Sequence, residues 1–421
     1  MKYNRQQDGA VCYNKVVPVR IFYSEKGENH RNGVRPVKYV NANDVLPEEL
    51  LSMIREYYQG GYLYIPREIF REVRRRTDYR IELEKRNHHI YLKHLEGRTN
   101  GQLGNLYHLS ESSIRRILAG ERRRYRKMKE RIERILPLWG METRQLTQIY
   151  SSAWEVNHSY VMKAYSDKGQ LERNIKITEI LAGCNIPVAE IVPIGAGEKY
   201  VAYENFYFFL SRKLQGSNIT DVKNKEIARK MGCAIARLHK AFLECEKEIT
   251  FWDNSLLDEM KGWVRENLAA DAWKTVDRES YARAVKSLEN VYGCLPKQLI
   301  HRDVHFGNFL FSEGSLSGYI DFDLSQRNIR IFDICYFLTG LLAEETEDAF
   351  TKKEWTENVR AVIAGYESIT RLLAEEKAAI PCVMECIEIL FAAYFIGMED
   401  FKHAKDAWEV FLFIQDCKED I

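Results

Sequence analysis

Two carboxylates and a carboxamide lie close together in the last third of the chain. Asp303 and Asn308 stand in the run His301-Arg302-Asp303-Val304-His305-Phe306-Gly307-Asn308, and Asp321 follows in Ile320-Asp321-Phe322-Asp323. Phosphoryl transfer from a nucleotide needs such groups, because the protein must hold metal ions on the phosphates and aim an acceptor oxygen at the γ-phosphorus. The pattern predicts that Asp303 orients the acceptor and accepts its proton, while Asn308 and Asp321 hold Mg²⁺.

Short apolar segments are placed to position these groups. Gln298-Leu299-Ile300 is typical of a strand that leads into the loop, and an apolar hairpin from Phe309 to Ile320 returns the chain to Asp321. Aspartates that merely cap turns are the alternative interpretation. The strand, the spacing within the loop and the hairpin together favour a catalytic loop.

The loop resembles that of the aminoglycoside phosphotransferase and choline kinase group, relatives of the protein kinases that phosphorylate hydroxyls of small molecules. The resemblance is carried by His301, Asp303, His305 and Asn308. Protein kinases usually have Lys at the position of His305. Arg302 is closer to the protein kinases and Phe306 replaces a frequent Pro, but neither is a metal or acceptor ligand.

The resemblance implies an α+β fold with a bilobal protein-kinase-like domain, in which a small β-rich lobe precedes a large helical lobe. It also implies ATP or GTP as the phosphate donor and Mg²⁺ as the cofactor. The acceptor would be a hydroxyl of a small molecule such as an aminoglycoside, an amino alcohol or a sugar.

The same resemblance assigns nucleotide-binding roles upstream. Lys163, in a short apolar strand, is implied to reach the α- and β-phosphates, although a surface lysine on an alternating strand is the alternative. The glycine-free turn with Ser151 and Ser152 takes the place of a Gly-rich phosphate loop. The next helix offers Glu172 as the expected partner of Lys163, with Glu179 as the alternative.

The hinge and the supports of the loop are also implied. Arg212 to Leu214 precede the hinge Gln215-Gly216 and would meet the adenine edge through backbone groups. His301 and Asp333 are expected to support the catalytic loop. Later helical patterns, which build the acceptor pocket in relatives, cover 355–374, 382–394 and 403–417.

The first third of the chain differs in charge. Residues 67–134 contain 20 Lys and Arg against 10 Asp and Glu, a net charge of +10, whereas the whole chain carries +1. A near-neutral total therefore hides a basic module attached to an acidic one. The chain is also too long for one ordinary compact core.

The basic module is predicted to contain a helix-turn-helix. Two helices, Gln102–Tyr107 and Ser110–Leu118, are expected, with Ser110 as the N-cap of the second. The residues expected to pack inward are Leu103, Leu106, Leu109, Ile114, Ile117 and Leu118. The residues expected at the major groove are Ser112, Ser113, Arg115 and Arg116, and those expected at phosphates are Arg122, Arg123 and Arg124.

The segment from Tyr39 to Leu95 resembles small Mor-activator-like helix-turn-helix proteins, so DNA is an expected partner and contact with RNA is the alternative. Arg122 to Arg134 is expected to form a separate linking helix. The expected organisation is a poorly ordered arm at 1–38, an all-α helix-turn-helix domain at 39–136, the small kinase-like lobe at 137–216 and the large lobe at 217–421.

The compartment can also be predicted. No apolar run of signal-peptide type and no uninterrupted apolar stretch of transmembrane length is visible. The nine cysteines are scattered, and none of their spacings completes a zinc site. Reduced thiols in a cytoplasmic protein without a membrane partner are expected, and the oligomeric state is left open.

Two other functions compete with a small-molecule kinase. In one, the kinase-like domain senses a ligand without catalysis and the chain is a DNA-binding transcription regulator, although the intact Asp303, Asn308 and Asp321 argue against lost catalysis. In the other, the chain phosphorylates protein Ser or Thr. His305 argues against a protein kinase, as does the lack of a recognisable Ala-Pro-Glu segment.

Overall fold

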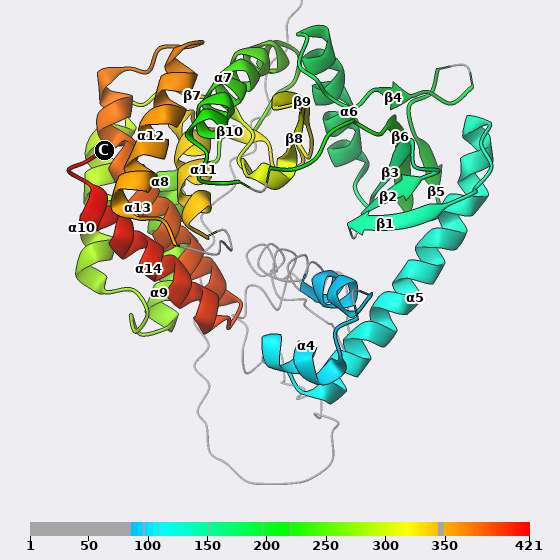
Figure 1. Cartoon of the computed structure of the whole chain (residues 1–421), viewed down its shortest axis with the longest axis horizontal. Coiled ribbons are helices and arrows are strands. Elements are labelled where there is room, and N and C mark those ends of the chain that lie inside the picture. Colours follow the sequence, from blue (N-terminus) through cyan, green and yellow to red (C-terminus); the bar gives the residue numbers. More distant parts are fainter. Residues whose placement is uncertain are drawn as a thin grey trace, which may run out of the picture. The chain divides into compact units, whose positions relative to one another are not determined.

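Short runs of apolar and β-branched residues after Leu146 pair into an antiparallel sheet (Figure 1). The computed structural model describes residues 86–421 apart from 96, 108, 151, 196, 220 and 344–348. The expected arm at 1–38 and the segment 39–85 of the expected basic domain lie outside the described residues. The strand order is β1-β2-β3-β6-β4, and β5 also pairs with β6. The strands are β1 Leu146–Tyr150, β2 Ala153–Val156, β3 Tyr160–Tyr165, β4 Ile191–Val192, β5 Val201–Tyr203 and β6 Phe206–Arg212.

Two helices cover the sheet, α5 Glu111–Ile135 on one face and α6 Lys168–Gly183 on the other. Successive side chains of a strand point to opposite faces. Met162 of β3 therefore packs toward α5, and Tyr165 packs toward α6. Lys163 shares the face of Tyr165, which directs its ammonium group toward the second lobe.

The second lobe is mainly helical, and Figure 1 draws α11 to α14 gathered together. Its helices are α7 Lys225–Glu248, α8 Leu256–Glu259, α9 Arg265–Ala270, α10 Arg278–Tyr292, α11 Ile331–Ala343, α12 Lys352–Glu367, α13 Ala374–Gly397 and α14 Phe401–Cys417. Its strands form two antiparallel pairs, β7 Lys297–Ile300 with β10 Gln326–Ile329, and β8 Phe309–Ser312 with β9 Ser315–Tyr319. The catalytic loop predicted from the sequence connects β7 to β8.

The connection between the lobes passes close to the β8–β9 hairpin. Gly216 has a φ of 122°, and a Cβ at this position would lie 2.8 Å from the carbonyl oxygen of Phe311 and would overlap the hydroxyl of Ser317. Glycine alone accommodates this backbone conformation and this close approach at low cost. The hinge at Gln215-Gly216 is therefore fixed against the hairpin that leads to Asp321.

Helix α13 forms the centre of the helical lobe. Among the described helices it is the one that has the length and apolar composition of a membrane-crossing segment, but most of it is buried inside the lobe. The core helix of a folded lobe meets the same criteria, since it is apolar on every side.

The helices before the sheet are arranged differently from the expectation. Helix α4 Asn100–Leu106 is followed by α5, which is one continuous helix rather than a second short helix and a separate linking helix. Gly120 lies inside α5 with a helical backbone, where a glycine costs only about 1 kcal/mol and does not end the helix.

Leu106 is 49% exposed, so the prediction that it packs inward was wrong. The buried apolar residues that hold this region together are Ile90, Tyr91, Leu103, Ile114 and Leu118.

Helices α7 and α12 pack so closely that two glycines are needed at the crossing. A Cβ at Gly232 would overlap the carbonyl oxygen of Val362 and lie 2.9 Å from the amide nitrogen of Tyr366. Both atoms belong to backbone, which cannot move aside without shifting a helix. Gly365 meets the backbone of Arg229 in the same way.

We expect Gly232→Ala to lower the free energy of unfolding by about 3 kcal/mol, because the added methyl group forces the two helices apart. Chemical denaturation followed by circular dichroism measures this loss. Gly120→Ala is the matched control. Among the described residues, no atom outside the backbone of its own helix and its chain neighbours lies within 4 Å of a Cβ at this position, so alanine there should be neutral or slightly stabilising. Equal stability of the two variants would contradict the close helix crossing.

Candidate active site

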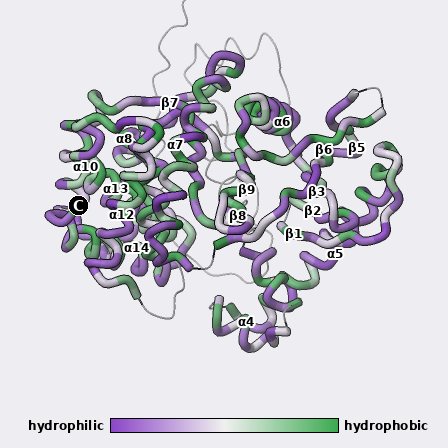
Figure 2. The backbone as a smooth tube through the Cα atoms, turned by 45° about the horizontal axis from the view of Figure 1, so that its top comes forward, coloured by the Kyte–Doolittle hydropathy of each residue, from purple (hydrophilic) through white to green (hydrophobic). Residues whose placement is uncertain are grey.

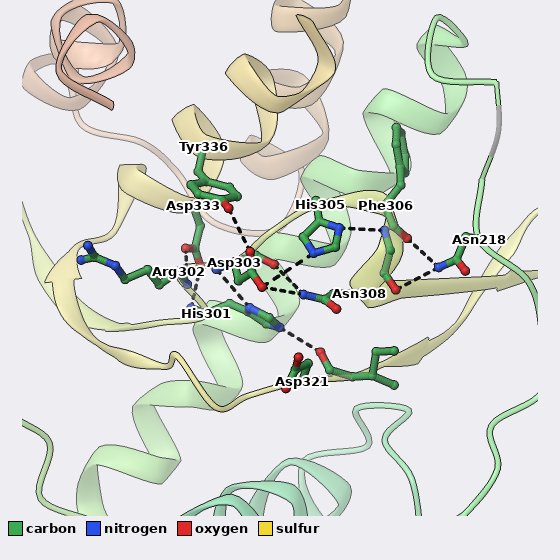
Figure 3. Close-up of polar contacts among 12 residues, drawn as sticks. Asn218, His301, Arg302, Asp303, His305, Phe306, Asn308, Asp321, Asp333 and Tyr336 are labelled. Carbon is green, nitrogen blue, oxygen red and sulfur yellow. Dashed lines mark hydrogen bonds and ion pairs between the residues drawn. The ribbon is translucent and has the colours of Figure 1, made fainter. Parts of the chain in front are cut away.

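A buried carboxylate on α11, that of Asp333, binds the backbone of the catalytic loop. One oxygen of Asp333 accepts the backbone N–H of His301 at 2.8 Å, and the other accepts that of Arg302 at 2.8 Å (Figure 3). The Nε2 atom of His239 lies 2.9 Å from the same carboxylate. Asp333 is fully buried, so its oxygens have these protein groups as partners in place of water.

The loop backbone is strained where it turns. Arg302 has a φ of +68°, a left-handed conformation that costs a residue with a side chain about 1–2 kcal/mol. The hydrogen bond from its N–H to Asp333 helps to hold it there. Its Nη2 atom also donates to both oxygens of Glu259 at 2.8 Å. His301 is fully buried, and its Nε2 atom lies 3.1 Å from the carbonyl oxygen of Ile320.

Both oxygens of Asp303 are oriented by neighbours (Figure 3). The hydroxyl of Tyr336 donates to Oδ1 at 2.9 Å, and the amide of Asn308 donates to Oδ2 at 3.2 Å. The Nε2 atom of His305 lies 3.7 Å from Oδ2. Burial disfavours the ionised carboxylate, but His305, His301 and Tyr336 outweigh it and hold the pKa of Asp303 well below its usual value. Asp303 is therefore ionised at neutral pH and ready to accept a hydrogen bond from a hydroxyl group.

Lys163 reaches across from β3 to the segment after β9. Its ammonium lies 3.0 Å from Asp321 Oδ1 and 3.3 Å from Asp323 Oδ2. Burial works against the charge of Lys163, but the two carboxylates prevail and its pKa is raised well above the usual value. Burial likewise opposes ionisation of Asp321, and Lys163 overcomes it, so that the pKa of Asp321 is lowered.

Glu172 does not pair with Lys163 as expected. It is an exposed residue of α6 that accepts a hydrogen bond from the hydroxyl of Tyr200 at 2.8 Å and lies 3.2 Å from Lys168. The helix turns Asn174 toward the site instead, because a residue two positions later lies on another face of an α-helix. Glu179, the alternative, pairs with Lys199.

A cavity of about 350 Å³ between the sheet and the catalytic loop has the size of a small-molecule or cofactor site, and we call it the nucleotide cavity after the role expected for Lys163. Lys163, Asn308, Asp321 and the expected hinge residues Arg212 and Leu214 line this cavity. Ser152 is exposed and does not belong to the described lining, and Ser151 lies outside the described residues.

Tyr150 and Asn218 are among the residues of the nucleotide cavity that were not predicted. Tyr150, at the end of β1, lines it, and burial together with the charges of Asp321 and Asp303 raises the pKa of its hydroxyl. Asn218 donates its amide hydrogens to the carbonyl oxygens of Phe306 and Gly307 at 2.9 Å each (Figure 3). An Asn shortly after a hinge carries no signal of this contact, which joins residues far apart in sequence.

A larger cavity of about 770 Å³ opens on the other side of the catalytic loop. His305 and Tyr336, which both contact Asp303, line this cavity together with Glu388 of α13. Burial of Glu388 raises its pKa from 4.5 to about 8, against a hydrogen bond with Thr339 that lowers it. Tyr336 was missed by sequence reasoning, although its position three residues after Asp333 places both on one face of a helix.

Asn308 and Asp321 offer the oxygen ligands that Mg²⁺ prefers. The side-chain N–H groups of Asn308 donate to the backbone carbonyl oxygen and to Oδ2 of Asp303, so the side-chain carbonyl oxygen of Asn308 is the atom that could bind a cation. Within the described residues, no group of three or more His, Cys, Asp or Glu is placed to hold a metal ion. Two protein oxygens suit Mg²⁺ that is bound mainly through nucleotide phosphates and water.

The residues expected to contact DNA lie on α5, whose hydrophilic residues are visible in Figure 2. Ser113 is half-buried, and the others are exposed: Ser112, Arg115, Arg116, Arg122, Arg123 and Arg124. Arg115 forms an ion pair with Glu111 at 3.1 Å, and Arg122 lies 2.9 Å from the ring of His94.

The profile of the phosphotransferase enzyme family matches residues 142–378, more than half of the chain. The chain belongs to this family. It is a small-molecule phosphotransferase with a hydroxyl group as acceptor. The homoserine kinase of Zymomonas mobilis is 26% identical over 230 residues, which cover 52% of this chain and 68% of that protein. The homoserine kinase of Phenylobacterium zucineum is 36% identical over 87 residues, 21% of this chain and 25% of that protein.

Solved structures share the fold of this phosphotransferase. An amicoumacin kinase with AMP-PNP and Ca²⁺ has a TM-score of 0.50 and 18% identity, covering 70% of this chain and 96% of that chain. A spectinomycin phosphotransferase with ADP and spectinomycin has a TM-score of 0.51 and 13% identity, covering 69% and 98%. The expected bilobal kinase-like fold, with a sheet lobe and a helical lobe, is thereby confirmed.

We expect Glu388 to make stability fall as pH rises. Its folded-state pKa of about 8 lies above the ordinary 4.5, so the native state holds one proton more than the unfolded chain between these values. This contribution is fully present below pH 4.5, declines by up to about 1.4 kcal/mol per pH unit and is lost above pH 8. Urea unfolding at pH 5 to 9 should show a weaker decline for Glu388→Gln, whereas the exposed Glu409→Gln keeps the parent's slope. Parallel curves for all three proteins would contradict the buried, neutral Glu388.

Proposed function

We propose that this phosphotransferase transfers the γ-phosphate of ATP, with Mg²⁺, to a hydroxyl of an amine-bearing small molecule. One observation carries the proposal. Asp303 is hydrogen-bonded to Asn308, which lines the nucleotide cavity, and to Tyr336, which lines the larger cavity. Its carboxylate thus stands at the boundary where a phosphoryl group would pass from one ligand to the other.

The charged groups around the nucleotide cavity have distinct tasks in this mechanism. Lys163 binds the phosphates that are not transferred, and Asn308 and Asp321 hold the cation. Mg²⁺, when bound, neutralises charge that develops on the phosphates. Asp303 accepts a hydrogen bond from the acceptor hydroxyl, aims its oxygen at the γ-phosphorus and takes up the proton as the new bond forms. Tyr336 and Asn308 keep the carboxylate in that orientation.

The lining of the larger cavity supports an acceptor that carries an amine. It includes the carboxylates of Asp406 and Glu409 and the carboxyl group of Glu388, whose ionised form an ammonium group beside it would favour. Tyr336, Phe391 and Phe395 add aromatic surface, which attracts ammonium groups through the face of the ring. The matched relatives are named homoserine kinases, and homoserine carries an ammonium group and a hydroxyl group.

The test is phosphate transfer from ATP and from GTP, with Mg²⁺, to amino alcohols, hydroxy amino acids, aminoglycosides and neutral sugars. We expect transfer to an amine-bearing acceptor, and a decrease of about 10²- to 10⁴-fold in kcat for Asp303→Asn. Asp420→Asn, which changes an exposed carboxyl, should keep the parent's rate. Glu388→Gln should raise KM for the amine more than it lowers kcat.

Transfer to sugars alone would contradict the amine-binding cavity. No transfer to any acceptor, with ATP still bound, would favour a ligand-sensing regulator over a kinase.

We propose nucleic-acid binding as a second function, because the turn before α5 supports a helix-turn-helix. A Cβ at Gly104 would lie 2.7 Å from the carbonyl oxygen of Leu109, so α4 and the chain entering α5 approach too closely for a larger residue. The side chain of Ser110 caps α5 through the N–H of Ser113. Ser112, Arg115 and Arg116 are then exposed on its first turns.

We expect the full chain to bind duplex DNA with an affinity that falls steeply with salt, since bound phosphates release counterions. Paired substitution of Arg115 and Arg116 by Ala should weaken binding at least tenfold and flatten the salt dependence. The matched control replaces Arg265 and Arg278, exposed on the helical lobe, and should bind as the parent does. Fluorescence anisotropy at several salt concentrations measures both. Equal weakening in the two double variants would mean that general charge, and not this helix, binds DNA.

A further inference from the structure

Asp323 has more partners than the aspartate expected to hold the cation. Its Oδ2 atom lies 3.3 Å from the ammonium of Lys163, and its Oδ1 atom accepts hydrogen bonds from the hydroxyl of Tyr165 at 2.8 Å and from the amide of Asn174 at 2.7 Å. These donors come from β3 and α6. One carboxylate therefore joins the sheet, the covering helix and the segment after β9.

Asp321 also contacts Lys163, but its place in the site is different. Its side chain is 45% exposed and lines the nucleotide cavity, whereas that of Asp323 is 21% exposed and lies outside the described lining. In the proposed function Asp321 turns to the cation. Asp323, whose two oxygens are both engaged within the protein, is then the carboxylate that stays with Lys163.

Helix α6 supplies an amide where protein kinases use an ion pair. In protein kinases a glutamate of the corresponding helix pairs with the phosphate-binding lysine. Here Asn174 lines the nucleotide cavity and is only 5% exposed. The two glutamates of the helix pair elsewhere, Glu172 with Lys168 and Tyr200, and Glu179 with Lys199. The amide of Asn174 contacts the carboxylate of Asp323 and so reaches Lys163 indirectly.

We propose that Asp323 is the positioning residue for Lys163, and that Asn174 links α6 to it in place of an ion pair. This inference rests on the proposed ATP-dependent function. It assigns Asp323 no contact with the nucleotide: the carboxylate holds the ammonium at the place where it meets the phosphates, and Tyr165 and Asn174 hold the carboxylate.

The inference is tested by calorimetric binding of Mg²⁺-ATP and of adenosine to the full chain. Adenosine lacks phosphates, so it reports whether the cavity is intact without reporting the position of Lys163. We expect Asp323→Asn to weaken ATP binding at least tenfold and to leave adenosine binding unchanged. Asn174→Asp, which changes a residue of the cavity lining, should weaken ATP binding at least tenfold and adenosine binding by much less. The first removes the charge that holds Lys163, and the second places two carboxylates against each other.

Two further variants sharpen the test. Glu172→Gln changes the glutamate of the same helix that sequence reasoning favours, and it should bind both ligands as the parent does. The double variant Asp323→Asn with Asn174→Asp exchanges the two side chains and returns one carboxylate to the cluster, now on α6. We expect it to recover part of the lost ATP affinity, a coupling that two independent structural defects would not produce.

The outcomes distinguish a failure of this inference from a failure of the proposed function on which it rests. A parent that binds no Mg²⁺-ATP would overturn the proposed function itself. A parent that binds ATP, with Asp323→Asn and Asn174→Asp equal to it, would overturn the positioning role alone. Adenosine affinity that falls in step with ATP affinity, an effect of Glu172→Gln on ATP, or no recovery in the exchanged variant would also overturn it.

Discussion

The catalytic loop of this phosphotransferase depends on one carboxylate that is removed from solvent. Asp333 accepts backbone N–H groups from two consecutive loop residues and contacts His239, whose other nitrogen lies 3.0 Å from the hydroxyl of Tyr366. Helices α7, α11 and α12 are thus tied to the loop through buried polar atoms. Each buried donor left without a partner would cost about 1–3 kcal/mol, so the helical core and the loop geometry stabilise each other.

One helix carries both the support of the loop and the orientation of its reactive group. Asp333 and Tyr336 stand one turn apart on α11, and they hold the backbone and the side chain of the catalytic segment respectively. A displacement of α11 would therefore move the base of the loop and the carboxylate of Asp303 together. Tyr336 also lines the larger cavity, so one residue of α11 contacts both this cavity and the carboxylate of Asp303.

Spacing along the chain was enough to predict much of the site. The remaining residues could not be predicted, because they are brought together by contacts between distant segments. The loop from His301 to Asn308 and the strand of Lys163 could be recognised because their chemistry lies within a few consecutive residues. The choice of Glu172 failed because the face that α6 turns to the sheet depends on packing of Leu171 and Ile175, and a shift of two positions rotates the helix face by about 200°. Asn218 contacts the loop, and Glu388 lines the cavity beside it, only because the tertiary fold brings distant segments together. The sequence analysis expected a short helix ending at Leu118 and a linking helix from Arg122, whereas the backbone between them, including Gly120, is helical and α5 is continuous.

The pairing of Arg302 with Glu259 has a consequence for control of the enzyme. In many protein kinases an added phosphate supplies the negative charge that orders the active site, through newly formed contacts with arginine. Here Arg302, which precedes Asp303, already lies 2.8 Å from both oxygens of a half-buried carboxylate, that of Glu259 on α8. The contacts that order the loop therefore form when the chain folds. An added phosphate is not needed to give Arg302 a negatively charged partner.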